Sequence, residues 1–358
     1  MRIALLHPTY WPEVRRGAER LVHDLAGWLT GAGHDVTVLT THRRAPTATD
    51  EDGFLVVRGW RPPDRLLRRR AYEDFLGTVP SQAIGVARGR FDVAQAFFPV
   101  SGWAALRARP YGGPPVVYSK MGIPTRPYLV ARRYRLEMNL ELARHAAACT
   151  VLSDAAAEPF RRFLLRDPEV IPAGVDCDTF AVDVERAEQP TIVYAGSPSD
   201  PRKRLPLLLA AFATLRRRRP GLRLQIAGRR EPWFRLELPE GAEWVDGDRT
   251  EDLARTLAAA HVAVLPAIEE AFGLVLVEAL AAGTPVVAAD SGASGELVTP
   301  DVGRLFEPDD AGALARALDE TLAIVAPREA CRAHARRWDW QAIGPRYEAV
   351  LARAAENG

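Results

Sequence analysis

The chain of 358 residues is 47% hydrophobic, and 47 Arg and Lys against 46 Asp and Glu give a formal net charge of +1. This length predicts two domains with separate hydrophobic cores, and the balanced charge gives no reason to expect a nucleic-acid partner. Three widely spaced cysteines argue against a disulfide framework or a zinc site, and no apolar run is long enough to span a membrane, so we expect a cytoplasmic protein.

Charge is distributed unevenly along the chain. Residues 1–170 hold 25 Arg and Lys against 17 Asp and Glu, and the remainder holds 22 against 29. A basic first half is compatible with peripheral contact with the inner face of a membrane, with attraction of a phosphorylated acceptor, or simply with solvated arginines. Only Lys120 and Lys203 are lysines, which fits the last interpretation.

The first forty residues predict a strand, a helix and a second strand. Residues 1–8 are a short apolar run ended by Pro8, residues 18–29 favour a helix, and residues 34–40 are apolar and β-branched. This order is typical of a parallel strand-helix-strand unit. In the loop before the helix, Gly17 allows the backbone to approach a ligand closely.

The same alternation continues to about residue 172. We predict strands at 52–59, 91–96, 115–119 and 149–153, with helical segments near 101–109 and 127–147. Two of these strands end at Gln95 and at Lys120-Met121, and strand ends in a parallel sheet face the ligand crevice. Residues 61–70 are strongly basic and predict a solvated surface or one that faces a membrane.

A second series of strands and helices begins after an acidic linker that ends near residue 190. We predict strands at 191–196, 222–228 and 262–266, and a helix at 205–217. Arg202, Lys203 and Arg204 precede this helix, so three cations and a helix N-terminus meet where a diphosphate could rest.

Residues 269–289 predict a loop, a helix and a strand in succession. The helix begins near Phe272 and ends at Gly283, which supplies a left-handed position before Pro285, and the strand covers 286–289. Glu270 lies just before this helix, beside the free amides of its first turn.

Glu278 is the one carboxylate within this apolar helix. A buried carboxylate is costly unless hydrogen-bond donors surround it, so Glu278 requires a partner. A carboxylate, a row of free N–H groups and a second carboxylate suit an extended ligand with hydroxyls at both ends and phosphate between them. A nucleotide diphosphate sugar has this layout.

The pattern Glu270, seven residues, Glu278, followed by Ala-Leu-Ala-Ala-Gly-Thr-Pro-Val-Val, resembles the donor-site signature of the retaining GT-B glycosyltransferases of sequence family 4, the glycosyl transferases group 1. Further resemblance to this family lies in the loop at 10–20, in Ile-Pro-Ala-Gly-Val-Asp at 171–176, in the glycine-rich turn at 290–296 and in the closing segment from 338.

The resemblance implies an α/β protein of GT-B fold, with two Rossmann-like lobes whose parallel sheets face an interdomain cleft. Residues 1–172 correspond to the acceptor-side lobe, residues 190–337 to the nucleotide-sugar lobe, and a helix at about 338–358 to a segment that packs back on the first lobe.

The implied reaction moves a sugar from a nucleotide diphosphate sugar to a hydroxyl acceptor with retention of anomeric configuration, and needs neither a metal nor another cofactor. Lys203 and Glu270 are the residues that the resemblance places at the reaction, and Glu278 is placed at the ribose. The donor contacts that it implies are Gly17, Gly196, Arg202, Lys203, Ala271, Phe272, Gly273, Leu274 and Glu278.

The main departures from the family pattern lie on the acceptor side. Relatives usually carry histidines where this chain has Gln95 and Met121. In the nucleotide-sugar lobe, Ser197 replaces a usual arginine. A catalytically silent nucleotide-sugar-binding subunit, a sugar-nucleotide epimerase and a phosphorylase of the same architecture therefore remain alternatives. The base, the sugar and the acceptor, whether glycan, lipid-linked or small molecule, are left open by the sequence.

Overall fold

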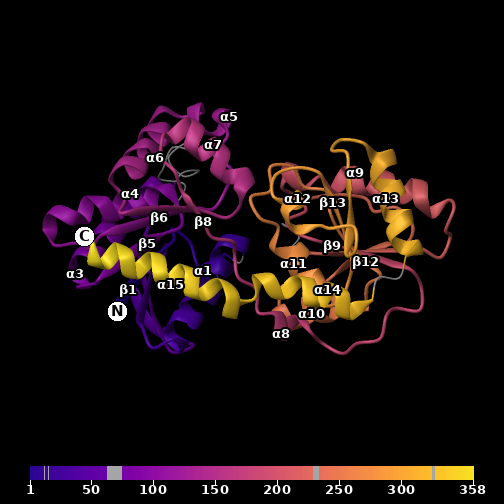
Figure 1. The fold of residues 1–358 in the computed structure, drawn as a ribbon, viewed down its shortest axis with the longest axis horizontal. Helices are drawn as coiled ribbons and strands as arrows, with labels where there is room; N and C mark the ends of the chain where they lie inside the picture. The colour runs from indigo at the N-terminus through magenta and orange to yellow at the C-terminus, as the bar shows by residue number, and fades with distance from the viewer. Residues whose placement is uncertain (12, 15, 63–74, 229–233, 325–326) are drawn as a thin grey trace. The chain divides into compact units, whose positions relative to one another are not determined.

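The computed structural model describes residues 1–358 except 12, 15, 63–74, 229–233 and 325–326. The chain forms two compact units, unit 1 with residues 1–174 and 343–358, and unit 2 with residues 175–342 (Figure 1). The chain therefore passes between the units twice, after Gly174 and within the helix α15 (Trp340–Glu356). Residues 175–190, which the sequence presents as an acidic linker, belong to unit 2.

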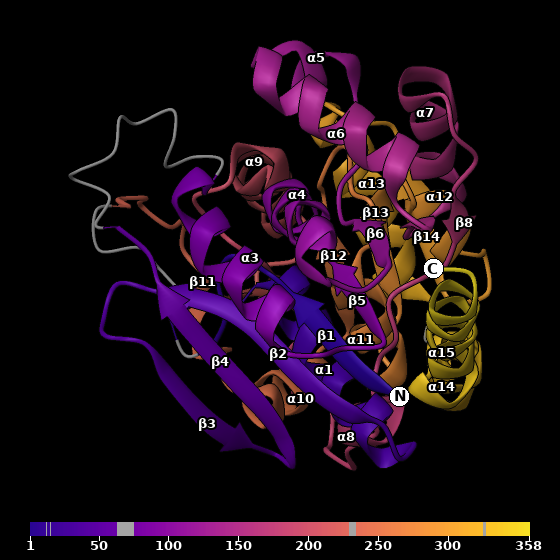
Figure 2. The same cartoon turned by 90° about the vertical axis from the view of Figure 1, so that its left-hand side faces the viewer.

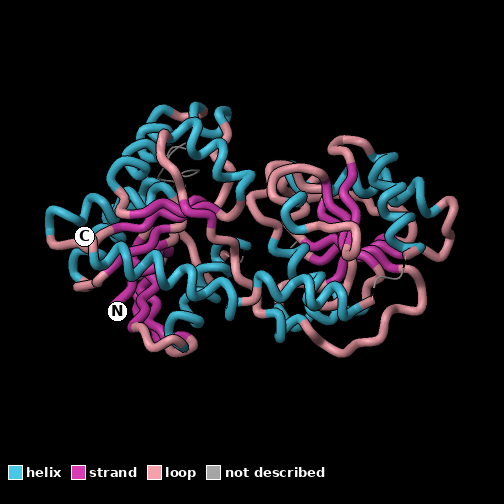
Figure 3. Tube along the Cα trace, viewed as in Figure 1, coloured by secondary structure: helices cyan, strands magenta, loops and turns pink. Residues whose placement is uncertain are grey.

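Unit 1 contains an eight-stranded sheet in the order β3-β4-β2-β1-β5-β6-β7-β8, parallel except for β3. In each unit the strands form a central layer with helices on both sides (Figure 3). The elements of unit 1 before the first crossing are β1 (Arg2–Leu6), α1 (Gly17–Gly31), β2 (Asp35–His42), β3 (Thr47–Glu51), β4 (Phe54–Trp60), η2 (Leu76–Thr78), α3 (Val79–Arg88), β5 (Val93–Ala96), α4 (Pro99–Ala108), η3 (Arg109–Tyr111), β6 (Val116–Lys120), α5 (Arg126–Val130), α6 (Arg133–His145), β7 (Ala148–Val151), α7 (Asp154–Leu164) and β8 (Glu169–Val170).

The sequence predicted a single strand at 52–59, but the structure has two strands here, the antiparallel β3 and then β4. Glu51 pairs with Phe54, so Asp52 and Gly53 form a two-residue hairpin loop, and both have a positive φ, 55° and 84°. An Asp-Gly pair favours this type of turn because both central residues must be left-handed. The polar sequence of β3 at the sheet edge lacks the apolar alternation that would have predicted it.

The C-terminal part of α15 packs on unit 1, in the position seen beside the sheet in Figure 2. Tyr347 is fully buried and donates a hydrogen bond to the carbonyl of Ile171 at 3.3 Å. Gly344 lies so close to the indole of Trp28 on α1 that a Cβ would come within 2.1 Å of the ring. The glycine therefore allows α15 to lie flat against α1.

Unit 2 contains a six-stranded parallel sheet in the order β11-β10-β9-β12-β13-β14. Its elements are α8 (Cys177–Phe180), β9 (Thr191–Ala195), η4 (Pro201–Lys203), α9 (Leu205–Arg216), β10 (Arg223–Ala227), β11 (Ala242–Val245), α10 (Thr250–Ala259), β12 (Val262–Leu265), α11 (Leu274–Ala281), β13 (Val286–Ala289), α12 (Ser294–Leu297), β14 (Gly303–Phe306), α13 (Ala311–Ala323), α14 (Arg328–Ala335), η5 (Arg336–Trp338) and the start of α15.

The core of unit 2 has two apolar layers. Leu208 and Phe212 of α9, with Leu314 and Leu318 of α13, pack on one face of the sheet. The helices α10 and α11 cover the other face, and every residue of β12 and β13 is buried, as expected for strands covered on both sides.

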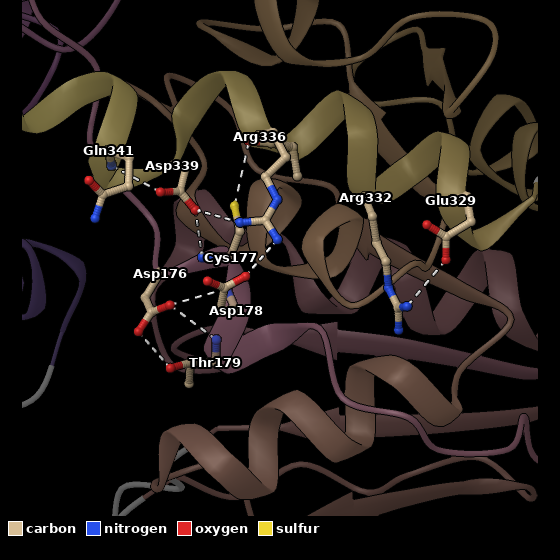
Figure 4. A network of polar contacts seen from close by, with 10 residues as sticks. Asp176, Cys177, Asp178, Thr179, Glu329, Arg332, Arg336, Asp339 and Gln341 are labelled. Atoms are coloured by element: carbon tan, nitrogen blue, oxygen red, sulfur yellow. Dashed lines mark hydrogen bonds and ion pairs between the residues drawn. The ribbon is translucent and has the colours of Figure 1, made fainter.

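A polar network joins the two ends of unit 2 where the chain enters and leaves it (Figure 4). Arg336 donates hydrogen bonds to Asp178 at 2.5 Å and to Asp339 at 3.2 Å. The amide of Cys177 also bonds to Asp339, and burial is the main cause that raises the pKa of the Cys177 thiol to about 12. Asp176 accepts from the amide of Thr179 and so caps the short helix α8.

Within the described part of the chain, no helix is both long enough and apolar enough to cross a membrane.

Candidate functional site

The strand order of unit 2 places a topological switch point between β9 and β12. The chain runs outward from β9 to β10 and β11 on one side, and from β12 to β13 and β14 on the other. Ligands of open parallel sheets bind at such a point, beyond the carboxyl ends of the strands. The two segments that leave the sheet there are 196–203, after β9, and 266–273, after β12.

Close backbone packing draws the strand ends together on one side of this point. A Cβ on Gly228 would lie 2.2 Å from the carbonyl oxygen of Gly196, and the Gly196 amide donates to Ala227 at 3.1 Å. Gly247, which follows β11, would likewise place a Cβ 3.0 Å from that of Ala227. Gly196 is therefore a close-approach residue of the loop after β9.

A turn after β13 holds the backbone of Glu270. The Glu269 amide donates to the Ser291 hydroxyl at 3.1 Å, and the Ala293 amide donates to the carbonyl of Glu270 at 2.9 Å. Gly292 has φ +62°, and a Cβ there would lie 2.2 Å from the Glu270 carbonyl oxygen. Glu269 itself adopts φ +52°, a costly conformation for a residue with a side chain. The turn fixes the backbone from which the Glu270 side chain projects.

Lys203 and Glu270 form an ion pair across the switch point. Lys203 ends the short helix η4, and both side chains are about four-fifths buried, with 23% and 20% of their surfaces exposed. The two loops are also tied through the backbone, because the Ile268 amide donates to the Arg202 carbonyl at 3.0 Å. The structure thus brings together the two residues that the sequence singled out for the reaction.

The neighbouring cations each have a carboxylate partner. Arg202 folds back on Asp200, with 2.7 Å between Nη2 and Oδ2. Burial raises the pKa of Asp200, but the hydrogen bonds from Arg202 and the charge of Lys203 outweigh burial and lower this pKa below its usual value. Arg204 pairs with Asp309 in the loop after β14. Arg202 therefore stays beside Lys203, whereas Arg204 is held by another loop.

The segment from Ala271 to Leu274 presents backbone to this site. The side chains of Ala271 and Phe272 are buried, and Gly273 has φ +97°. Of the hydrogen bonds among described residues, none joins the amides of Phe272 or Gly273 to a backbone acceptor. These N–H groups and the N-terminus of α11 are suited to an anion. The helix begins at Leu274 rather than near Phe272, because Gly273 is left-handed.

Glu278 lies in the middle of α11 and is 2% exposed. At the other end of this helix, Arg186 donates to the carbonyl of Gly283 at 3.1 Å, and Arg328 donates to the carbonyl of Ala282. Arg328 also donates to Ala258, near the end of α10, at 2.9 Å. Two cations therefore stabilise the C-terminal dipoles of the helices that flank the sheet.

Gly17 belongs to unit 1, where it begins α1 and is exposed. The nearby carboxylate of Glu19 is buried and accepts a hydrogen bond from the Thr9 hydroxyl at 2.7 Å. Gln95 is also buried and donates to the Ser119 hydroxyl at 2.7 Å, and Met121 is half-buried. The side chain of Gln95 thus forms a buried hydrogen bond between the neighbouring strands β5 and β6.

The sequence analysis did not predict the roles of several residues of the site. Ser291 and Gly292 were noted only as part of a glycine-rich turn, and their hold on the Glu270 backbone was not predicted. Asp200 and Asp309, the partners of Arg202 and Arg204, were not singled out either. For Asp200 a local signal existed, since Asp before Pro at the start of a helical turn is a common cap. No local sequence pattern identifies Asp309 as the partner of Arg204.

Models of two protein families match the chain. "Glycosyl transferases group 1" matches residues 178–338 and "Glycosyltransferase Family 4" matches residues 15–179. A phosphatidyl-myo-inositol mannosyltransferase of Mycolicibacterium smegmatis is 30% identical over 388 aligned residues that cover 100% of this chain and 95% of the relative. A protein of the same name from Propionibacterium freudenreichii is 27% identical, with 100% and 96% covered.

Solved structures share the fold. Sucrose-phosphate synthase from Thermosynechococcus elongatus superimposes with a TM-score of 0.83 at 20% identity, and all of both chains is covered. Anabaena Alr3699/HepE in complex with UDP-glucose gives a TM-score of 0.76 at 19% identity, with 98% of this chain and 99% of that chain covered.

Proposed function

The chain belongs to the group 1 glycosyltransferases, enzymes of GT-B fold that transfer sugar from a nucleotide sugar, and we propose that it does so with retention of anomeric configuration and without a metal. The observation that carries the proposal is the Lys203–Glu270 pair at the β9/β12 switch point, beside the amides of Phe272 and Gly273. Together these groups offer a cation and free amides to a diphosphate and a carboxylate to sugar hydroxyls.

Lys203 has the first role in the proposed mechanism. Negative charge grows on the leaving diphosphate as the bond to the sugar breaks, and a fixed ammonium nearby stabilises that charge in the transition state. Arg202 and the amides of Ala271 to Leu274 would share this role. Protein cations then replace a metal ion.

Glu270 and Glu278 have binding roles in the proposal. The carboxylate of Glu270 is held in place by the turn at 291–293 and would accept hydrogen bonds from the sugar hydroxyls. Glu278 lies four residues into α11, and we propose that it accepts from the ribose hydroxyls. Positioning by fixed side chains lowers the entropic part of the barrier.

The proposal is tested by calorimetric titration with UDP, GDP, ADP and dTDP in the presence of EDTA. We expect one of the four to bind, and Lys203→Met to weaken that binding by about 10-fold or more, because a charge-assisted contact is worth about 1.5–3 kcal/mol. Absence of binding by all four nucleotides, or strict dependence on added Mg²⁺ or Mn²⁺, contradicts the proposal.

Transfer is then assayed with the sugar conjugates of the nucleotide that binds. Mannose is the first sugar to test, because relatives over the full chain are named mannosyltransferases, and inositol-containing acceptors are the first acceptors for the same reason. The anomeric configuration of the product, measured by NMR, decides between retention and inversion. An acceptor that is a glycan, a lipid-linked sugar or a small molecule would be found in the same assay.

A silent nucleotide-sugar-binding subunit is the second candidate, and the residues at Gln95 and Met121 favour it, because family members usually have histidines there. Binding of a nucleotide sugar without transfer to any acceptor would support it. Release of an epimerised donor, or a need for free phosphate, would instead indicate the epimerase or the phosphorylase.

We also propose a cytoplasmic location with peripheral contact of unit 1 at the inner face of a membrane. The excess of basic residues in the first half of the chain supports this, although most of the basic segment at 61–70 lies outside the described residues. Flotation with anionic and neutral liposomes tests it, and equal recovery with both contradicts it.

A further inference from the structure

His7 follows β1, the strand that borders the switch point of the sheet in unit 1. The strand β2 pairs with one side of β1 and β5 pairs with the other, so the switch point lies between β1 and β5 (Figure 2). Phe98 lies just after β5, and its ring is nearly perpendicular to the imidazole of His7, with 5.9 Å between the ring centres. These two side chains therefore flank the place where open parallel sheets bind ligands.

The imidazole of His7 is held through its Nδ1 atom. Nδ1 lies 2.8 Å from the carbonyl oxygen of Thr9, and the Thr9 hydroxyl donates in turn to the buried carboxylate of Glu19 at 2.7 Å. That carboxylate is 3.8 Å from Nδ1. The backbone is fixed as well, because the side chain of Gln82 donates to the His7 carbonyl at 3.0 Å. The fold therefore sets the orientation of the ring, as a binding site requires.

The contact with Thr9 decides which nitrogen of the neutral ring carries the hydrogen. It is the shortest polar contact of Nδ1, and a carbonyl oxygen only accepts, so Nδ1 carries the hydrogen and Nε2 has the free electron pair. His7 is 4% exposed, but among the described residues its Nε2 is not one of the fully buried polar atoms that lack a partner. Nε2 therefore reaches the surface and presents a hydrogen-bond acceptor there.

Other histidines of unit 1 use Nε2 within the protein. His42 ends β2 at the same edge of the sheet, and its Nε2 lies 2.8 Å from the carbonyl oxygen of Ala45. This Nε2 must donate, so it has no electron pair to offer. In His34, Nε2 lies 3.0 Å from the carboxylate of Glu348. The accepting Nε2 of His7 thus differs from both.

The surroundings of His7 favour an uncharged hydroxyl as its ligand. A free electron pair attracts a hydrogen-bond donor and repels the oxygens of a phosphate or carboxylate, and the carboxylate of Glu19 adds to this repulsion. Arg61, which follows β4 at the same edge, is 3% exposed and pairs with Glu13 at 2.7 Å. Phe98 is half-buried and supplies apolar surface of the kind that lines ligand sites. A ring that carries a hydroxyl suits both side chains.

We propose that His7 is a specificity residue whose Nε2 accepts a hydrogen bond from one uncharged hydroxyl of the acceptor, while Phe98 packs on the ring that carries this hydroxyl. The proposal rests on the function proposed above, because nearly all donor contacts proposed there lie in unit 2 and the hydroxyl is therefore assigned to the acceptor. Thr9, Glu19 and Gln82 are positioning residues that act through His7. A site built to bond a hydroxyl rejects an analogue that lacks it.

The test compares two amide replacements of His7. Asparagine places an amide nitrogen near the position of Nδ1 and keeps a donor for Thr9, but it has no atom at the position of Nε2. Glutamine places its carbonyl oxygen near the position of Nε2 and keeps the acceptor. A structural role favours His7→Asn, and the proposed role favours His7→Gln. His42→Gln is the matched control, because His42 lies at the same edge of the sheet and donates within the protein.

The probes are myo-inositol and methyl α-mannoside, titrated by NMR into protein saturated with the nucleoside diphosphate that binds it. We expect the wild type to bind at least one probe. His7→Asn should lower that affinity about 5- to 10-fold, as the loss of one neutral hydrogen bond implies, and His7→Gln and His42→Gln should stay within about 3-fold. Phe98→Leu should weaken binding about 3-fold or more, because a ring contact is lost. Unchanged melting temperatures exclude a folding defect.

Nitrogen NMR of protein with isotope-labelled histidine gives a readout that a purely structural role would not move. We expect the Nδ1–H tautomer for His7 and a shift of its Nε2 signal when the probe is added, since Nε2 then accepts a hydrogen bond. This measurement uses the wild type and needs no substitution, so it decides the question even where a variant fails to fold.

Several outcomes would overturn the proposal. They are an Nε2–H tautomer of His7, an Nε2 signal that no probe shifts, equal affinities of His7→Asn and the wild type, and a larger loss in His7→Gln than in His7→Asn. Failure of both probes to bind would do the same, and equal affinity of Phe98→Leu would refute the ring contact. Failure of the nucleoside diphosphate to bind refutes the proposed function instead, and the titration without nucleotide then still tests His7.

Discussion

Gly292 offers the sharpest test of how the site is built, because it touches the backbone of Glu270 without taking part in any proposed contact with the donor. Alanine at this position adds one methyl group. That group would lie 2.2 Å from the carbonyl oxygen and 2.8 Å from the amide nitrogen of Glu270. Neither atom belongs to a flexible side chain, so the loop that carries Glu270 must move.

The cost of Gly292→Ala has two parts. The left-handed conformation, φ +62°, costs a residue with a side chain about 1–2 kcal/mol, and insertion of a methyl group into packed backbone costs about 1–3 kcal/mol more. The control is Gly112→Ala, since Gly112 has φ +86° but no atom within 4 Å of a Cβ. The control therefore has only the first cost, about 1–2 kcal/mol.

Thermal unfolding and donor turnover are the assays. A domain of this size loses about 2–4 °C per kcal/mol, so Gly292→Ala should lower the melting temperature roughly twice as much as Gly112→Ala. It should also reduce kcat about 10- to 100-fold, because a displacement near 1 Å at a reacting group has effects of this order. A Gly292→Ala variant with the melting temperature of the control and wild-type kcat would refute the role of the turn in holding Glu270.

Three further predictions concern side chains of unit 2. Glu270→Gln should reduce the turnover of the sugar donor by about 10-fold or more with little loss of nucleotide affinity, and a wild-type rate would reject the sugar contact. Glu278→Ala should weaken nucleoside diphosphate binding in calorimetry, and unchanged affinity would show that Glu278 is a purely structural residue of α11. Arg328→Met should destabilise unit 2 by about 1.5–3 kcal/mol in urea unfolding, because it leaves carbonyls at the ends of α10 and α11 without donors, and a change within error would exclude that role.

Much of the site follows from local sequence. The helix α11 and the strand β13 occupy nearly the residues expected, because an apolar run, a left-handed glycine and a proline each act on their immediate neighbours. The meeting of Lys203 and Glu270 was also implied, by the resemblance to a family, and the structure shows the ion pair. The fold class was predicted in the same way and is confirmed by structures of the same architecture.

The remaining features depend on contacts that no local pattern contains. Gly292 contacts Glu270 only because β12 and β13 are neighbours in the sheet, and sequence spacing does not give the distance between two loops. Asp309 reaches Arg204 from a loop beyond β14. The hairpin strand β3 is polar and lies at an edge, so it has no apolar period, and only the Asp-Gly turn marks it.

The cations of the candidate site in unit 2 already have partners, and this bears on binding. Arg202, Lys203 and Arg204 each have a carboxylate partner, so in the proposed binding mode a donor diphosphate would replace Glu270 or Asp200 as the partner of a cation. Exchange of one anion for another changes the net Coulomb energy little, and the geometry of sugar and nucleotide then decides affinity.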